Sequence, residues 1–153
     1  MAYIFGGIAS IGVVVSLLIS AWQTRELVRQ TAISNGIAGA SARYNGLERL
    51  HYVENFMAAD PGLHAYFYGG ADLPADGPER HRVQTVLRML ADTVDYGLMV
   101  NELNPEIRSS DGWRSYALLL RASSPAFVRV VNEHPDWWAA LSAHWAANPA
   151  AGS

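Results

Sequence analysis

The chain has 153 residues, a formal net charge of -3 and no cysteine. The lack of cysteine excludes disulfides, iron–sulfur clusters, cysteine-ligated zinc and thiol catalysis. All 11 basic residues are arginines scattered along the chain, so no basic patch marks a nucleic-acid partner. The length leaves room for one compact domain beyond any N-terminal segment.

An uncharged, almost wholly apolar run covers residues 3–22. As a helix it would be about 30 Å long, which matches the hydrocarbon thickness of a bilayer. A signal peptide would carry a basic region before the run and a small-residue cleavage site after it, and neither is present. A buried helix of a soluble protein is rarely wholly apolar over such a length. We therefore predict an uncleaved transmembrane helix over residues 1–22.

The residues that flank this run predict its orientation. Arg25 and Arg29 follow it and no basic residue precedes it, so the positive-inside rule places the N-terminus outside and the rest of the chain in the cytoplasm. Tyr3 and Trp22 lie near its two ends, where aromatic residues anchor a span at the membrane interface.

Small residues recur every four positions within the run, at Gly12, Ser16 and Ser20. Positions four apart share one helix face, and small side chains there let another helix approach closely. We predict that this face packs against other transmembrane subunits or a second copy of the chain. The run contains no ionisable side chain, which argues against an ion pathway, a proton relay or a histidine-ligated haem within it.

A short heptad-like seam follows, with apolar residues spaced by four, three, four and three: Ile33, Ile37, Ala40, Tyr44 and Leu47. Gly36, Gly39 and Gly46 weaken the helical pattern, each by about 1 kcal/mol relative to alanine. The first helix is therefore expected to end near residue 35, and a second helix is expected over residues 41–59.

The remaining chain reads as short helices separated by proline and glycine. Asp60 and Pro61 predict a helix start, with Asp60 as the N-cap. The clearest amphipathic helix begins at Pro78 and continues to Leu103. Ser110 or Asp111 is expected to cap the next helix, Ser124 is expected to cap another, and the last helix begins after His134. The apolar faces of these helices predict a core built on Val83, Leu87, Leu90, Val94, Trp113, Phe127 and Trp145.

No stretch alternates with the period of a strand, so the predicted fold is all-α. It consists of one N-terminal transmembrane helix followed by a compact domain of about five helices. The predicted segments are the span at residues 1–22, a helical juxtamembrane linker at 23–40, the helical cytoplasmic domain at 41–147 and a flexible tail at 148–153.

Several stretches together resemble a family of small bacterial membrane proteins that have one N-terminal span and a cytoplasmic helical domain. The matching stretches are QTRELVRQT at residues 23–31, DPGLHAYFY at 60–68, MLADTVDY at 89–96, GWRSY at 112–116, SPAF at 124–127 and HPDWW at 134–138. The resemblance implies a fold and a location in the bacterial inner membrane. It implies no reaction, cofactor or catalytic residue.

One motif could in principle bind a metal. Glu48 and His51 form an E-x-x-H pattern, but di-iron bundles need two such motifs and two further carboxylates on facing helices. Asp92 and Asp95 could supply carboxylates, although a polar edge or a hydrogen-bonding pair explains them more simply. The ligand count falls short, so we predict no metal, no cofactor and no catalytic residue, and hence no enzyme.

The adjacent Trp137 and Trp138 cannot both face inward on one helix, so at least one is expected to meet a partner, a lipid headgroup or a loop. The sequence favours a non-catalytic, single-pass accessory or assembly subunit that docks onto a larger respiratory, photosynthetic or transport complex. The alternative is a membrane-tethered signalling or ligand-binding domain that forms a homo-oligomer through the heptad seam.

Overall fold

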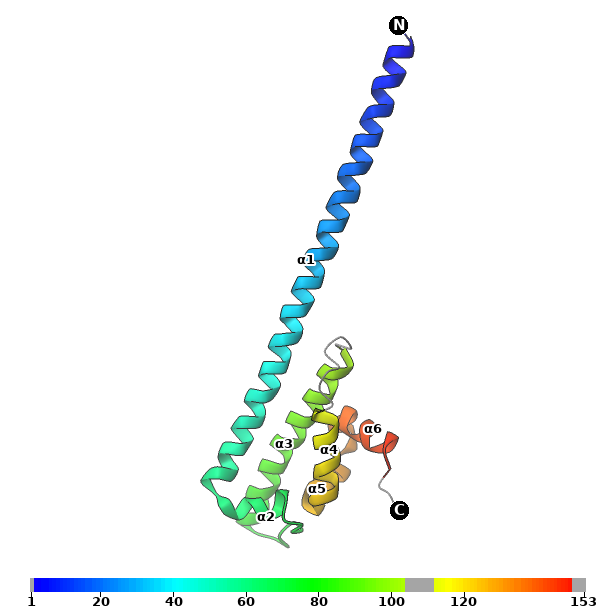
Figure 1. The fold of residues 1–153 in the computed structure, drawn as a ribbon. Coiled ribbons are helices and arrows are strands. Elements are labelled where there is room, and N and C mark those ends of the chain that lie inside the picture. Colours follow the sequence, from blue (N-terminus) through cyan, green and yellow to red (C-terminus); the bar gives the residue numbers. More distant parts are fainter. Residues whose placement is uncertain (1, 104–111, 150–153) are drawn as a thin grey trace. The chain divides into compact units, whose positions relative to one another are not determined.

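The computed structural model describes residues 2–103 and 112–149, with side chains described from Val13 onward. This part of the chain is helical and contains no strand, and the chain divides into two compact units, residues 1–40 and residues 41–153. The elements, shown in Figure 1, are α1 (Ala2–Ala59), the 3-10 helix η1 (Pro61–Leu63), α2 (His64–Phe67), α3 (Pro78–Leu103), α4 (Gly112–Ser123), α5 (Pro125–Glu133), the 3-10 helix η3 (Pro135–Trp138) and α6 (Ala139–Ala147).

Helix α1 runs from Ala2 to Ala59 without interruption. The expected break between residues 35 and 41 was wrong. Sharp kinks need a proline, a bulge or an inserted side chain, and the first proline of the chain, Pro61, comes after α1 has ended. The glycines lower helix propensity by only about 1 kcal/mol each, which weakens a helix without stopping it.

The first unit is the N-terminal part of α1, and its described side chains are almost all exposed. The exposed apolar residues there include Val13, Val14, Val15, Leu17, Leu18, Ile19, Trp22, Leu27, Val28, Ile33 and Ile37. Over the residues with described side chains, no helix is both long enough and apolar enough to cross a membrane. Residues 1–12 of the predicted span lie outside that description.

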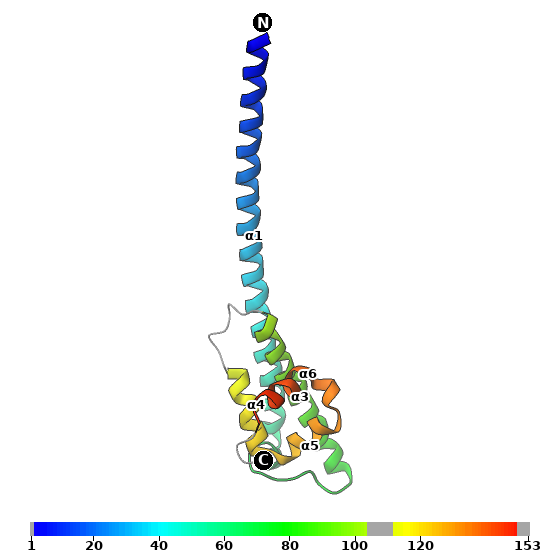
Figure 2. The same cartoon turned by 90° about the vertical axis from the view of Figure 1, so that its right-hand side faces the viewer.

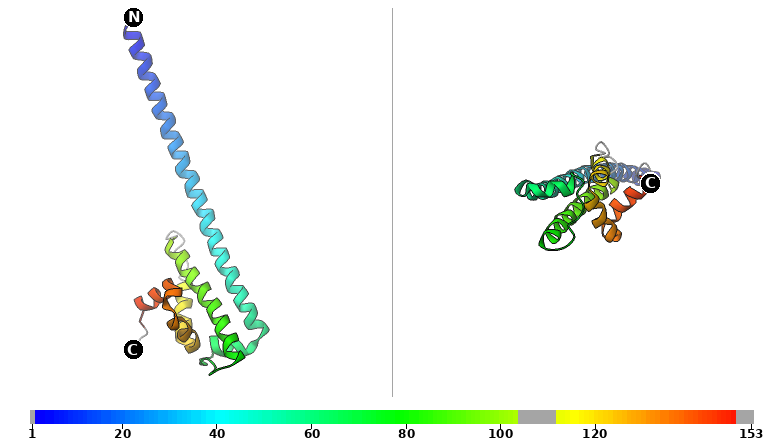
Figure 3. Two further views of the ribbon diagram at one scale, coloured as in Figure 1. Left: turned by 180° about the vertical axis from the view of Figure 1, so that it is seen from behind. Right: turned by 90° about the horizontal axis from the view of Figure 1, so that it is seen from below.

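The second unit has a core arranged around α3. The predicted bounds of this helix, Pro78 and Leu103, are confirmed. Six of the seven predicted core residues are buried, and Trp113 is partly buried against them. Helices α4, α5 and α6 each pack on α3, and α4 also packs on α5 and α6 (Figure 2). Views from behind and from below show α5 and α6 on the same flank of α3 (Figure 3).

Two predicted N-caps are confirmed. The Asp60 carboxylate accepts a hydrogen bond from the Gly62 amide at 3.2 Å and also pairs with Arg82. Ser124 Oγ accepts from the Phe127 amide at 3.0 Å and donates to the carbonyl oxygen of Tyr66 at 2.5 Å. The predicted caps at Ser110 and Asp111 lie outside the described residues.

Three helices meet at Trp113, the second residue of α4. Its indole lies against α3 at Gly97, where an added Cβ would overlap the ring, and against α1 at Gly46, where a Cβ would lie 3.3 Å from Cζ2. Both glycines therefore provide space for a tryptophan from a third helix.

Substituting Gly97 tests this packing. Gly97→Ala raises helix propensity by about 1 kcal/mol but places a methyl group inside the Trp113 ring, so it should destabilise the domain by about 1–3 kcal/mol net. Urea unfolding of the full chain, followed by tryptophan fluorescence, measures the change. The control is Gly36→Ala, where an added Cβ meets nothing within 4 Å and stability should be equal or higher. Similar results for the two variants would contradict the close approach.

Candidate functional site

The predicted membrane-packing face lies on α1. Ser16 and Ser20 are exposed there, while Gly12 lies on the same helix with its surroundings outside the described residues. Tyr3, one of the predicted interface anchors, also falls outside the side-chain description. The other anchor, Trp22, is 68% exposed.

Charged and hydroxyl side chains follow Trp22 along α1. Arg25 and Arg29 are both exposed. Thr24 Oγ1 donates to the carbonyl oxygen of Ser20 at 2.8 Å, and Thr31 does the same to Leu27 at 2.9 Å. Both hydroxyls are thus satisfied within the helix and need no water to hydrogen-bond their protons.

Asp92 and Asp95 of α3 attach the C-terminal helices. Trp138 Nε1 donates to Asp92 Oδ1 at 2.7 Å, and the amide of Leu141 donates to Asp95 Oδ1 at 2.9 Å. The local N-cap position of α6, Trp138, has no side-chain capping bond, so Asp95 caps this helix from a neighbouring element. A carboxylate at a helix N-terminus also interacts favourably with the helix dipole. The two aspartates form a structural hydrogen-bonding pair.

Burial raises the pKa of the Asp95 carboxyl above its ordinary value of 3.8, and the hydrogen bonds from the α6 backbone oppose this shift only in part. The folded domain therefore holds a proton on Asp95 more tightly than the unfolded chain does. The pKa of Asp95 is lower in the unfolded chain than in the folded domain. As pH rises through these two pKa values, ionisation of Asp95 stabilises the unfolded chain more than the folded domain, so the free energy of unfolding falls.

Asp95→Asn separates capping from charge. The amide oxygen can still accept from the Leu141 backbone, but it does not titrate, so the stability of this variant relative to the parent should increase as pH rises above about 4. Urea unfolding at a series of pH values gives the difference. Asp95→Ala should be less stable by about 1 kcal/mol at every pH because α6 loses its cap. If asparagine and alanine are equally destabilising, Asp95 does not act as a cap.

The tryptophan pair is divided between core and surface. Trp138 is 1% exposed, whereas Trp137 is 58% exposed. The Trp137 ring stacks on His134, with centroids 4.0 Å apart and planes at 10°, and the Arg88 guanidinium lies 5.5 Å from its centroid. Trp138 is buried and cannot contact a partner protein. Of the two tryptophans predicted to contact a partner, only Trp137 is therefore accessible.

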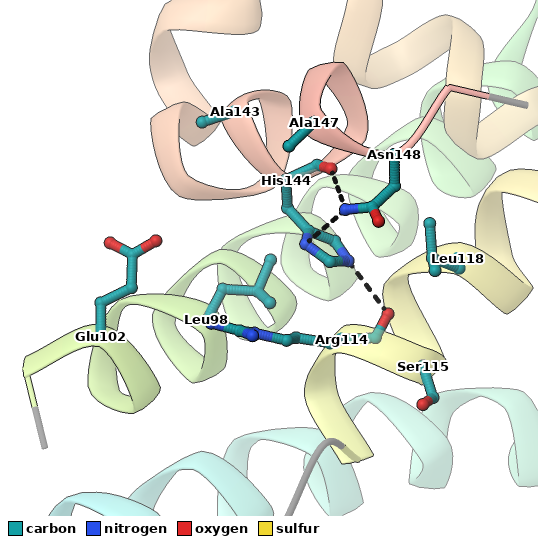
Figure 4. A pocket seen from close by; sticks show the side chains of 9 residues that line it. All are labelled: Leu98, Glu102, Arg114, Ser115, Leu118, Ala143, His144, Ala147 and Asn148. Carbon is teal, nitrogen blue, oxygen red and sulfur yellow. Dashed lines mark hydrogen bonds between the residues drawn. The ribbon is translucent and has the colours of Figure 1, made fainter. Parts of the chain in front are cut away.

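A surface cavity of about 590 Å³ opens between α3, α4 and α6 (Figure 4). Its His144 points toward the start of α4, where Nε2 donates to the carbonyl oxygen of Arg114 at 3.2 Å, and Nδ1 faces the Asn148 amide nitrogen at 3.4 Å. The histidine therefore uses both ring nitrogens within the fold and joins α6 to α4. The lining residues are Leu98, Glu102, Arg114, Ser115, Leu118, Ala143, His144, Ala147 and Asn148.

A second groove of about 550 Å³ lies between α3 and the C-terminal part of α1. Glu48 and Asp92 both line it, whereas His51 of the E-x-x-H motif is not part of its wall. Among the residues that the structure describes, no three histidine or carboxylate side chains come together as a metal site.

Two further contacts had no sequence signal. Arg121 Nη1 donates to the carbonyl oxygens of Trp145 and Asn148, each at 2.9 Å, and so binds the C-terminal end of α6. The hydroxyls of Tyr68 and Tyr116 lie 2.7 Å apart. Burial raises the pKa of the Tyr116 phenol far above its ordinary value, and the hydrogen bond with Tyr68 acts in the same direction. Both contacts join segments far apart in the sequence.

Comparisons with protein-family models, with curated proteins and with solved structures found no match to this chain. The resemblance to a family of small single-span membrane proteins stays a prediction.

Proposed function

We propose that this chain is a non-catalytic, single-span membrane protein that serves as an accessory or assembly subunit of a larger membrane complex. In this proposal the N-terminal part of α1 crosses the bilayer, with the N-terminus outside and the helical domain in the cytoplasm. The membrane that α1 crosses in this proposal is the bacterial inner membrane.

The observation that carries the proposal is the exposure of residues 13–22 on an unbroken helix. Removing one large apolar side chain from water is worth about 1.5–3 kcal/mol. A helix that exposes valine, leucine and isoleucine all round its circumference therefore has a strong drive toward lipid or another apolar surface. The uncharged sequence continues from residue 12 back to residue 3, which extends this apolar surface to the length of a bilayer.

The residues after the apolar run support the orientation. Trp22 suits the membrane interface, and Arg25 and Arg29 follow within two turns. The hydroxyls of Thr24 and Thr31, bonded to the helix backbone, let α1 continue across the interface without unsatisfied donors.

The helical domain offers one pre-arranged aromatic surface for attachment. Trp137 is exposed but fixed by stacking on His134 and by Arg88. A rigid exposed tryptophan is the residue type that most often contributes strongly to protein interfaces. Its position in the second unit would place the contact on the cytoplasmic side.

The orientation can be tested with reporters fused after Ser153. A reporter that is active only in the cytoplasm should give full signal, and one that is active only in the periplasm should give none, because the arginines after the run retain the C-terminal side in the cytoplasm. The matched variant replaces Arg25 and Arg29 with glutamine and should reduce this asymmetry. Signal from the periplasmic reporter on the parent chain would contradict the orientation.

Attachment can be tested by purifying the full chain from native membranes in mild detergent and identifying co-purifying proteins by mass spectrometry. Replacing Gly12 and Ser16 with leucine keeps the run apolar but adds bulk where a partner helix must approach, so recovery of the partner should fall about tenfold or more. Val14→Leu with Leu18→Ile is the control on the other face and should change little.

Two results would overturn the proposal. If the parent chain co-purifies with no other protein, it is not an accessory subunit. The alternative function, a membrane-tethered signalling or ligand-binding domain that forms a homo-oligomer, would then be favoured. If the chain is recovered from the soluble fraction, the span is absent.

A further inference from the structure

The heptad seam, defined as Ile33, Ile37, Ala40, Tyr44 and Leu47, is exposed along α1. Ile37 is 63% exposed and Tyr44 is 70% exposed, and the other three are also open to solvent. Because α1 is unbroken, these residues follow one helix at an average spacing of 3.5. This spacing keeps an apolar stripe facing a partner helix when two helices supercoil with a left-handed twist.

The stripe has defined ends. One heptad before Ile37 stands Gln30, and one heptad after Tyr44 stands His51. The apolar contact is therefore confined to residues 33–47. In heptad terms Ile37 and Tyr44 occupy a positions, and the other three seam residues occupy d positions.

The seam is compatible with the packing of the second unit. At about 100° per residue, Gly46 and Val53 lie on the side of α1 opposite Tyr44. Gly46 receives the Trp113 indole and Val53 is 1% exposed, so this opposite side is the one that packs on the domain. Tyr44 and Leu47 stay free to meet a second helix.

The charges that flank the seam indicate which helix that is. Arg43 immediately precedes Tyr44 and occupies a g position, and Glu48 immediately follows Leu47 and occupies an e position. In a parallel pair, a g residue meets the e residue five positions further along the partner, so each Arg43 meets a Glu48. In an antiparallel pair g meets g, which would bring the two arginines together.

We propose that a second copy of this chain occupies the seam, forming a parallel two-stranded coiled coil over residues 33–47 with reciprocal Arg43–Glu48 pairs. Both charged side chains are exposed, and no ion pair engages either of them within the described chain. The pairing rests on the seam and its charges alone and stands apart from the accessory-subunit function. If the chain does span a membrane, two copies inserted the same way are already parallel and concentrated near each other.

Cysteine cross-linking of the full chain tests the geometry, since the parent has no cysteine and gives no background. In a parallel pair each d residue faces its own counterpart, so Ala40→Cys should form a disulfide-linked dimer under mild oxidation. Asn35→Cys, also exposed but on the other side of α1, is the control and should cross-link at least about fivefold less. Equal yields from the two positions would overturn the proposal.

Charge exchange in the Ala40→Cys background tests the partner and its orientation. Arg43→Glu alone, or Glu48→Arg alone, turns both interhelical pairs into like-charge contacts and should lower the dimer yield about five- to tenfold. Combining the two changes restores opposite charges in a parallel self-pair and should return the yield to the parent level. Failure of the combined variant to recover, or no effect of either single change, would show that α1 does not pair with itself in this register.

Discussion

Helix α3 can fold stably only if its apolar face is covered, and the helices that cover it are too short to persist without it. Ten of its residues are buried. Helix α4 has 12 residues, and α5 and α6 have nine each, which is at or below the length at which an isolated helix is marginal in water. Each therefore owes its helical state to contact with α3. A substitution such as Leu90→Ala, which leaves a cavity in that face, would weaken all three at once.

Burial of apolar surface is non-directional, so a set of polar links fixes how the short helices sit. Asp92 and Asp95 hold η3 and the start of α6 against α3, and Arg121 of α4 holds the other end of α6. Each link crosses between two elements, and the one to Asp92 gives the buried indole of Trp138 its hydrogen-bond acceptor. The core supplies most of the stabilisation, and these bonds select one arrangement of it.

The elements of the second unit could be predicted because their signals are local. Pro78 begins α3, and Ser124 caps α5 through a bond to a residue three positions away. The Trp113 site could not be predicted, since Gly46 and Gly97 gain their role only when three helices meet.

Two other features of the structure also differ from the sequence-based expectations, each for its own reason. Asp95 caps a helix that begins 44 positions later in the chain, and no pattern in the sequence relates the two. The break expected in α1 gave too much weight to glycine propensity, which is a weak signal where no proline interrupts the helix. The transmembrane assignment of residues 1–22 rests on the length of the apolar run and its lack of charge, and it stays a prediction.

The order of the elements also has a consequence for synthesis. Helix α6, which carries Leu141 and Trp145 into the core, is made after every other described helix. At about 5–20 residues per second, the ribosome needs roughly 6–25 seconds to travel from Trp22 to the end of α6. During that interval the nascent chain presents two apolar surfaces in succession. The first is the exposed apolar surface of α1, and the second is that of α3, which stays uncovered until the later helices have been translated.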